Sequence, residues 1–368
     1  MVDRIIMNSC RWELYNYSLP LENPLRMLSQ TLKVRKGLIL RLYDQAGNFG
    51  EGEISPMPLM HVESLSQAET QLKKFLTNSF QQNPDLFKSL PPSVRFGFEM
   101  AWRTLFKKFD LEEKIHSRAE VIFESERAEN HTALKQIPVN ALVTGSGDDL
   151  KHQCDQIKLD GFKAVKIKVG QLNVHEDLKR LELAKKIIGN QIALRVDANR
   201  GWEFSQATEF AMGVRDFNLE YCEEPLRNIK QLEKLHEHTG MQVALDETLW
   251  SNPDPIELPN SAISALILKP GILGGWVNTC LWINHAEKHK LQAVISSSME
   301  SGIGLNWIAF TDLYLLNKRT PAGLDSAKFF QNDLADPPFS ISQGNYVFPN
   351  SWPVANKDYL NKISHGGW

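Results

Sequence analysis

The chain has 368 residues and a mass of 41.9 kDa, a length that favours two domains or one large barrel with an added segment. Its formal net charge of −3 argues against a nucleic-acid partner, and no apolar run approaches the ~18 residues of a membrane-spanning helix. The first residues lack the apolar core of a signal peptide, and no two of the cysteines form a C-x-x-C pair. We therefore expect a cytoplasmic globular protein with reduced thiols and with neither nucleic-acid nor membrane partners.

The N-terminal part predicts an α+β segment. Apolar and polar residues alternate over 11–19 and 37–54, which is typical of strands, and Gly47 fits the turn of a hairpin. Apolar residues near every third or fourth position then predict helices over 64–76 and 93–109. We expect this α+β segment to form a domain of its own.

From Ile137 onwards short apolar runs alternate with helical stretches, at intervals of about 25 residues. This alternation predicts parallel strands, covered on both faces and joined by helical crossovers. Because no G-x-G-x-x-G follows the first strand, a closed (β/α) barrel fits better than an open doubly wound sheet. We predict an α+β capping domain over 1–130, a barrel over 131–321 and a C-terminal segment, 322–368, that returns to the cap.

Five ionisable residues fall at the C-terminal ends of five successive predicted strands. They are, in chain order, Lys168, Asp197, Glu223, Asp246 and Lys269. In a parallel barrel these strand ends converge on the face that carries active sites. A strand also ends at a charge where it simply reaches solvent, but three acids between two lysines, in uninterrupted succession, favour a functional site.

The three acids suit a hard divalent cation with oxygen ligands. Mg²⁺, with Mn²⁺ as a substitute, fits better than zinc because neither cysteine nor histidine contributes. The pair His285 and His289 has the spacing of a helical metal clamp, but it reads as the polar face of an amphipathic helix. A metal beside a flanking lysine suits removal of a proton next to a carboxylate, so we expect a small-molecule carboxylate as substrate.

Two further charges share a strand face with the strand-end residues, because side chains alternate with a period of two. Lys166 lies two residues before Lys168, and a neighbouring cation and partial burial would lower the pKa of a lysine towards the working pH. The alternative is that Lys166 forms an ordinary salt bridge. Arg195 lies two residues before Asp197 and would either bind a substrate carboxylate or brace the metal ligands.

Taken together and in order, these motifs resemble the enolase superfamily, in its muconate-lactonizing-enzyme subgroup. The motifs are K-I-K at Lys166–Lys168, D-A-N at Asp197–Asn199, E-E-P at Glu223–Pro225, D-E at Asp246–Glu247 and L-K-P at Leu268–Pro270. The resemblance implies an α/β fold, a modified TIM barrel (β/α)7β with an α+β cap. Within the subgroup, G-E-I-S-P-M-P at 52–58 and S-S-S-M-E-S at 296–301 resemble the o-succinylbenzoate synthase family.

That family implies a lyase that dehydrates 2-succinyl-6-hydroxy-2,4-cyclohexadiene-1-carboxylate to o-succinylbenzoate in menaquinone biosynthesis. By correspondence of the motifs, Lys168 would remove the proton and then help hydroxide to leave, and Lys269 would stabilise the enediolate as a cation. Mg²⁺ would be bound by Asp197, Glu223 and Asp246. The residues that would bind the substrate or support the site are Lys166, Arg195, Asn199, Ser297, Ser298 and Glu300.

The loop serines also suit a simpler role, as caps of the helix that follows, and free N–H groups there would receive a substrate carboxylate as well. Two other functions stay open. N-succinylamino acid racemases and dipeptide epimerases of the same subgroup use the same lysines and metal triad, and they differ in cap loops such as 20–31. A non-catalytic barrel, kept as a scaffold, would be expected to have lost a lysine or a ligand. The sequence makes no prediction of the oligomeric state.

Overall fold

The computed structural model describes residues 10–26, 31–77, 85–106, 136–252, 254–258 and 261–368. The predicted boundary between cap and barrel near residue 130 lies outside these residues, so the domain division stays a prediction. No helix in the described ranges has both the length and the apolar character needed to cross a bilayer. All four cysteines are buried free thiols.

An antiparallel sheet of four strands in the order β16-β1-β2-β3 forms the cap. Its strands are β1 (Arg11–Arg26), β2 (Thr31–Tyr43), β3 (Phe49–Ile54) and β16 (Asn361–Gly367). The predicted hairpin is confirmed: β2 and β3 pair through a turn in which Gly47 has a φ of 85°. Period-two alternation places Trp12, Leu14 and Leu40 on one face, where they pack against the cap helices. These helices are α1 (Leu65–Thr77), α2 (Asp85–Lys88) and α3 (Pro92–Phe106).

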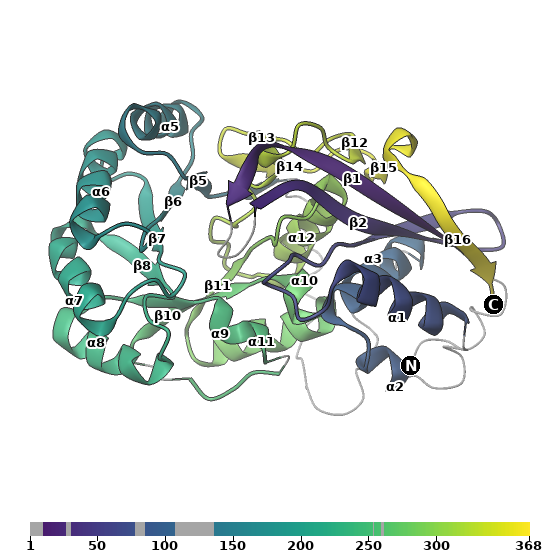
Figure 1. Cartoon of the computed structure of the whole chain (residues 1–368), viewed down its shortest axis with the longest axis horizontal. Helices are drawn as coiled ribbons and strands as arrows, with labels where there is room; N and C mark the ends of the chain where they lie inside the picture. Colours follow the sequence, from purple (N-terminus) through teal and green to yellow (C-terminus); the bar gives the residue numbers. More distant parts are fainter. Residues whose placement is uncertain (1–9, 27–30, 78–84, 107–135, 253, 259–260) are drawn as a thin grey trace.

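Seven parallel strands form the second sheet, in the order β11-β10-β9-β8-β7-β6-β5, which follows the sequence order throughout. The strands are β5 (Ala141–Val143), β6 (Ala164–Lys168), β7 (Ala193–Asp197), β8 (Leu219–Glu223), β9 (Val243–Leu245), β10 (Ile263–Leu268) and β11 (Gln292–Ile295). Helices cover the outside of the curled sheet, as Figure 1 shows. This arrangement confirms the predicted α/β barrel-like fold with a capping domain.

The crossover helices alternate with these strands. They are α5 (Gly147–Leu159), α6 (Val174–Ile188), α7 (Phe204–Gly213), η1 (Arg215–Phe217), η2 (Ile229–Gln231), α8 (Leu232–Thr239), α9 (Glu247–Trp250), α10 (Pro270–Leu273), α11 (Trp276–Lys288) and α12 (Gly302–Leu315). Inside the sheet a small apolar cluster fills the lumen, formed by Tyr221, Ala244, Ala265, Ile267 and Val294. These residues alternate along their strands with residues that pack outwards against the helices.

Backbone hydrogen bonds of Ala322 and Gly323 link β11, the last strand of the parallel sheet, to the residues that lead into β5, its first strand. The Gly323 N–H donates to the Ile295 carbonyl (2.8 Å), and the Ala322 N–H donates to the Pro138 carbonyl (2.9 Å). Both residues form isolated parallel bridges, Ala322 with Val139 and Gly323 with Ser296. The eighth position of the barrel is therefore filled by two residues rather than by a regular strand.

The C-terminal segment lies beside the cap, where β16 pairs with β1 (Figure 1). Its other elements are η3 (Ala327–Phe329), β12 (Ala335–Asp336), β13 (Ile341–Ser342), β14 (Asn345–Val347), β15 (Val354–Ala355) and η4 (Lys357–Tyr359). The first apolar run of the predicted barrel, 137–143, does not form a single strand. Its first half belongs to β4 (Gln136–Pro138), which pairs with β14, and the chain enters the barrel only at Ala141.

Candidate active site

The strand-end charges meet at one end of the barrel. Lys168, Asp197 and Glu223 are register partners on β6, β7 and β8, so their side chains lie side by side on the lumen face. Asp246 and Lys269 directly follow β9 and β10, where each is the residue before a short helix. The parallel sheet thus brings together all five residues that the sequence singles out.

The three acids are almost completely buried, with exposed fractions of 2% for Asp197, 0% for Glu223 and 1% for Asp246. Each carboxylate contacts a lysine. Lys168 Nζ lies 2.9 Å from an oxygen of Asp197, and Lys269 Nζ hydrogen-bonds an oxygen of Asp246. Buried carboxylates need such partners, because a charge removed from water is costly unless it is paired.

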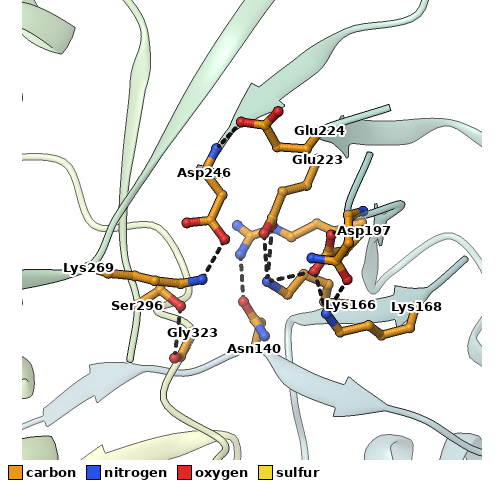
Figure 2. Close-up of polar contacts among 12 residues, drawn as sticks. Asn140, Lys166, Lys168, Asp197, Glu223, Glu224, Asp246, Lys269, Ser296 and Gly323 are labelled. Atoms are coloured by element: carbon orange, nitrogen blue, oxygen red, sulfur yellow. Dashed lines mark hydrogen bonds and ion pairs between the residues drawn. The ribbon is translucent and has the colours of Figure 1, made fainter. Parts of the chain in front are cut away.

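Figure 2 shows Lys269 and Lys168 entering from opposite sides, with their amino groups pointing towards the acids between them. Lys269 is the more enclosed, with 9% of its side chain exposed, and its Nζ lies 5.3 Å from the centre of the Trp250 ring. Lys168 has 33% of its side chain exposed. The two lysines therefore differ in their access to solvent, although each contacts one acid of the same row.

Lys166 lies within the acid row and not at its edge. Its Nζ is 3.0 Å from Glu223 Oε2 and 3.9 Å from Asp197 Oδ2. Burial would lower the pKa of Lys166, but the carboxylates of Glu223, Asp197 and Asp246 outweigh burial and raise it. The expected lowering of this lysine's pKa is therefore not what the structure gives, because three acids surround the cation.

The pKa values of the acids report the same crowding. Burial, together with the neighbouring carboxylates of Asp197 and Asp246, raises the pKa of Glu223 to about 8. Burial would also raise the pKa of Asp197, but the charges of Lys168 and Lys166 hold it at about 2. The row thus places three carboxyl groups close together in a buried site, where the neighbouring lysine cations offset part of their mutual repulsion.

In the described ranges no three His, Cys, Asp or Glu side chains are grouped as a ready metal site. Lysine nitrogens engage oxygens of Asp197, Glu223 and Asp246 in this structure. The donor chemistry itself fits a hard cation, because three buried carboxylates supply oxygen ligands only. A divalent ion and the lysine nitrogens would compete for the same oxygens.

Two hydrogen-bond networks, one through Asn199 and one through Glu224, support the row. Asn199 Oδ1 accepts a hydrogen bond from Lys168 Nζ (2.5 Å), and its Nδ2 donates to Glu247 (2.9 Å). Glu224 accepts from the Asp246 N–H (3.0 Å) and from Arg200 Nε (2.9 Å), so it links two neighbouring strand ends behind the row. Arg200 was not identified from the sequence; the only available signal is its place directly after D-A-N.

Arg195 lies in the barrel lumen and is fully buried. Its guanidinium donates to Glu220 (2.7 Å), Asn140 (3.0 Å), Thr320 (2.8 Å) and the Pro321 carbonyl (2.7 Å). These protein groups occupy its donors, and two of them, Thr320 and Pro321, directly precede the residues Ala322 and Gly323 that close the barrel. The geometry therefore favours a brace of the barrel over a direct substrate contact.

The loop after β11 holds the remaining candidates. Ser297 Oγ shares a hydrogen bond of 2.9 Å with Ser326 Oγ, and the Ser298 N–H donates to Glu300 Oε2 (2.6 Å). Ser301 caps α12 by accepting from the Ile303 N–H (3.3 Å), so the capping role foreseen for this loop is present. Next to these residues, Ser296 Oγ donates to the Gly323 carbonyl at 3.2 Å (Figure 2).

Two family models match the chain. One described as enolase C-terminal domain-like matches residues 149–352, and one described as the MenC N-terminal domain matches residues 9–105. The o-succinylbenzoate synthase of Aliivibrio fischeri is 30% identical over 326 residues, which cover 88% of this chain and 92% of that protein. The protein PHYLLO of Arabidopsis thaliana is 33% identical over 74% of this chain, and the match spans 17% of its length.

Solved structures share the fold at lower identity. A dipeptide epimerase from Cytophaga hutchinsonii, crystallised with Mg and a dipeptide, superposes with a TM-score of 0.75 at 21% identity and covers 97% of this chain and 99% of its own. An N-succinyl Arg/Lys racemase from Bacillus cereus gives a TM-score of 0.77 at 19% identity, covering 97% of this chain and 100% of its own. The family models and the match to the Aliivibrio fischeri protein show that the chain belongs to the o-succinylbenzoate synthase family of the enolase superfamily.

Proposed function

We propose that this protein is a Mg²⁺-dependent o-succinylbenzoate synthase. It would dehydrate 2-succinyl-6-hydroxy-2,4-cyclohexadiene-1-carboxylate to o-succinylbenzoate, a step of menaquinone biosynthesis, in the cytoplasm. The observation that carries this proposal is the family match over nearly the full length, combined with two lysines on opposite sides of a row of three buried acids.

The two lysines would have different tasks, as their surroundings suggest. Lys168 is the more exposed of the two, so it can leave Asp197 and reach a bound substrate. It would take the proton next to the substrate carboxylate and return a proton to the departing hydroxide, so that one water leaves and the ring becomes aromatic. Asn199, which accepts from Lys168 Nζ, would hold the amine in position between the two transfers.

Lys269 would remain an ammonium ion throughout the reaction. It is enclosed between Asp246 and the Trp250 ring, an environment that stabilises a cation. From this position it would stabilise the negative charge that develops on the substrate as the proton leaves. Lys166 would balance the charge of Glu223 and Asp197 and would take no direct part in the proton transfers.

Asp197, Glu223 and Asp246 would hold the metal ion. A Mg²⁺ ion at this row would supply a Lewis acid that stabilises negative charge on the substrate carboxylate. Ser297, Ser298 and Glu300 would shape the substrate side of the pocket, in the loop that precedes the N-terminus of α12.

The test uses the purified chain with Mg²⁺ and the cyclohexadiene substrate. We expect the protein to aromatise the substrate, which is monitored by the change in ultraviolet absorbance. Treatment with a chelator should abolish this activity. N-succinyl amino acids incubated with the protein in D₂O test the alternative, since racemisation exchanges the α-proton for deuterium. Racemisation without dehydration would overturn the proposal in favour of a racemase or epimerase, the activities for which structurally similar proteins are named.

A further inference from the structure

Glu53, a buried carboxylate of the cap, lies at the start of a barrel helix. It stands on β3 with no exposed surface. Its oxygens accept from the Ser301 N–H (3.0 Å), from Ser301 Oγ (2.6 Å) and from the Gly304 N–H (2.8 Å). Tyr17 Oη donates a fourth hydrogen bond of 2.5 Å. A cap side chain thus satisfies free N–H groups at the N-terminus of α12, where a negative charge is also favoured by the helix dipole.

Arg35, a second cap residue, holds the same loop from the other side. Its exposed fraction is 1%, and its Nε donates to the Met299 carbonyl (2.9 Å). The rest of the guanidinium is fixed by backbone carbonyls of the cap, including that of Pro56 (3.1 Å). Met299 has a φ of 67°, a conformation that residues other than glycine rarely adopt. The contact with Arg35 therefore stabilises a backbone shape that the loop would not favour alone.

The loop between these two anchors packs against α10, the short helix that follows Lys269. A β-carbon placed on Gly271 would lie 2.7 Å from Glu300 Oε1 and 3.3 Å from Ser298 Oγ, so a larger residue there would displace these two side chains of the loop. His61 Nε2, from the cap, contacts the Gly271 carbonyl at 3.2 Å. Cap, loop and the start of α10 thus form one continuous set of contacts beside the acid row.

We infer that Glu53 and Arg35 are positioning residues for substrate binding. They fix the backbone of the Ser296–Ser301 loop between cap and barrel, and so set the distance of Ser297 and Ser298 from the lysines and acids. The inference rests on the proposed function for the identity of the substrate. The contacts by which Glu53 and Arg35 hold the loop, here called the clamp, do not depend on the proposed function.

Glu51 provides a matched control. It lies two residues from Glu53 on the same strand and is also buried, with an exposed fraction of 3%. Its partners are Arg41 and the Ala355 N–H (2.6 Å), and none of them belongs to the Ser296–Ser301 loop. Glu51→Gln and Glu53→Gln therefore remove one buried charge each from the same strand, but only the second alters the contacts of the loop.

The experiment compares these two variants with the parent chain in three measurements: KM and kcat for the cyclohexadiene substrate, Mg²⁺ affinity by calorimetry, and backbone hydrogen exchange of the segment 296–304. We expect Glu53→Gln to raise KM at least about tenfold. The amide group of the new glutamine would face the Ser301 and Gly304 N–H groups with a donor, so the loop would lose contacts that hold it. Exchange of the segment should accelerate, while Mg²⁺ affinity stays within about twofold. Glu51→Gln should change KM by less than about threefold and leave the segment's exchange unchanged.

Equal effects of the two variants on KM, or unchanged KM and exchange in Glu53→Gln, would overturn the inference. If Glu53→Gln does not fold, Arg35→Lys replaces it, since it keeps the charge and loses the fork that holds Met299. The same two outcomes then decide. A parent chain without dehydratase activity would refute the proposed function alone, because the difference in hydrogen exchange between the variants still tests the clamp.

Discussion

The acid row and the Ser296–Ser301 loop lie close together in the fold, but they are positioned in different ways. Each charge of the row is placed by its own strand, through period-two alternation and a register that pairs Lys168 with Asp197 and Asp197 with Glu223. The loop is placed by the cap, through residues that are 248 positions away in the chain for Glu53 and Ser301. The comparison suggests that rigid strands carry the proposed chemistry, and that the junction of two domains shapes the proposed recognition of the substrate.

The largest effect is expected from removing the proposed base, which tests the strand-built half of the comparison. Lys168→Ala should lower kcat by about 10³-fold or more, because general acid–base catalysis is lost in both proton transfers. Mg²⁺ binding, measured by calorimetry, should remain. Lys163→Ala is the control, since Lys163 is exposed and lies directly before the same strand. A Lys168→Ala enzyme with the parent kcat would show that another group is the base.

Lys269 should come next. Lys269→Ala should lower kcat about 10²- to 10³-fold, because a charge that stabilises the developing anion is removed. It should also lower the free energy of unfolding, because Asp246 is left buried and unpaired. Lys269→Arg keeps the charge and separates the two effects when kcat and thermal unfolding are measured together. Unchanged turnover in Lys269→Ala would contradict its proposed role.

A smaller effect is expected at the metal. Asp246→Asn should weaken Mg²⁺ binding about 10- to 100-fold, since a neutral amide replaces a charged ligand. Glu220→Gln is the matched control, because Glu220 is also an acid of the barrel but pairs with Arg195 and not with the row. Calorimetric titration of both variants gives the comparison. The same Mg²⁺ affinity in Asp246→Asn as in the parent would remove Asp246 from the proposed ligand set.

The smallest effect concerns the cap contact of His61 and its pH dependence. Burial lowers the pKa of His61 from 6.5 to about 4 in the folded protein, so between these values the unfolded chain binds more protons. The contribution of His61 to stability is therefore complete above pH 6.5 and is lost as the pH falls towards 4. His61→Gln should reduce the change in the free energy of unfolding across this pH window by about 1–2 kcal/mol. Denaturant unfolding at pH 7 and pH 4.5 measures it, and identical pH profiles of variant and parent would contradict this account.

The fold and the acid row were largely predictable from the sequence, for a local reason. Apolar runs ending in one charge mark the parallel strands, and parallel strands deliver their ends to one face. The split of 137–143 was not predictable in this way. The run is apolar except for Asn140, but Pro138 lacks an N–H, and the chain changes partners from β14 to the barrel within three residues.

The contacts between cap and barrel could not be predicted from the sequence pattern. The motif around Glu53 was noticed, but nothing in a single sequence indicates that this carboxylate meets the Ser301 and Gly304 N–H groups. The raised pKa of Lys166 was missed for a related reason. In the sequence only the neighbouring cation Lys168 is evident, whereas in the structure three carboxylates also surround Lys166. Both features depend on distances between strands and domains.

A crystal structure with Mg²⁺ and o-succinylbenzoate bound would test the central claim most directly. The account predicts one ion about 2.0–2.1 Å from oxygens of Asp197, Glu223 and Asp246. It also predicts the amino groups of Lys168 and Lys269 on opposite faces of the product. An ion bound away from these acids, or both lysines on one side of the product, would contradict it.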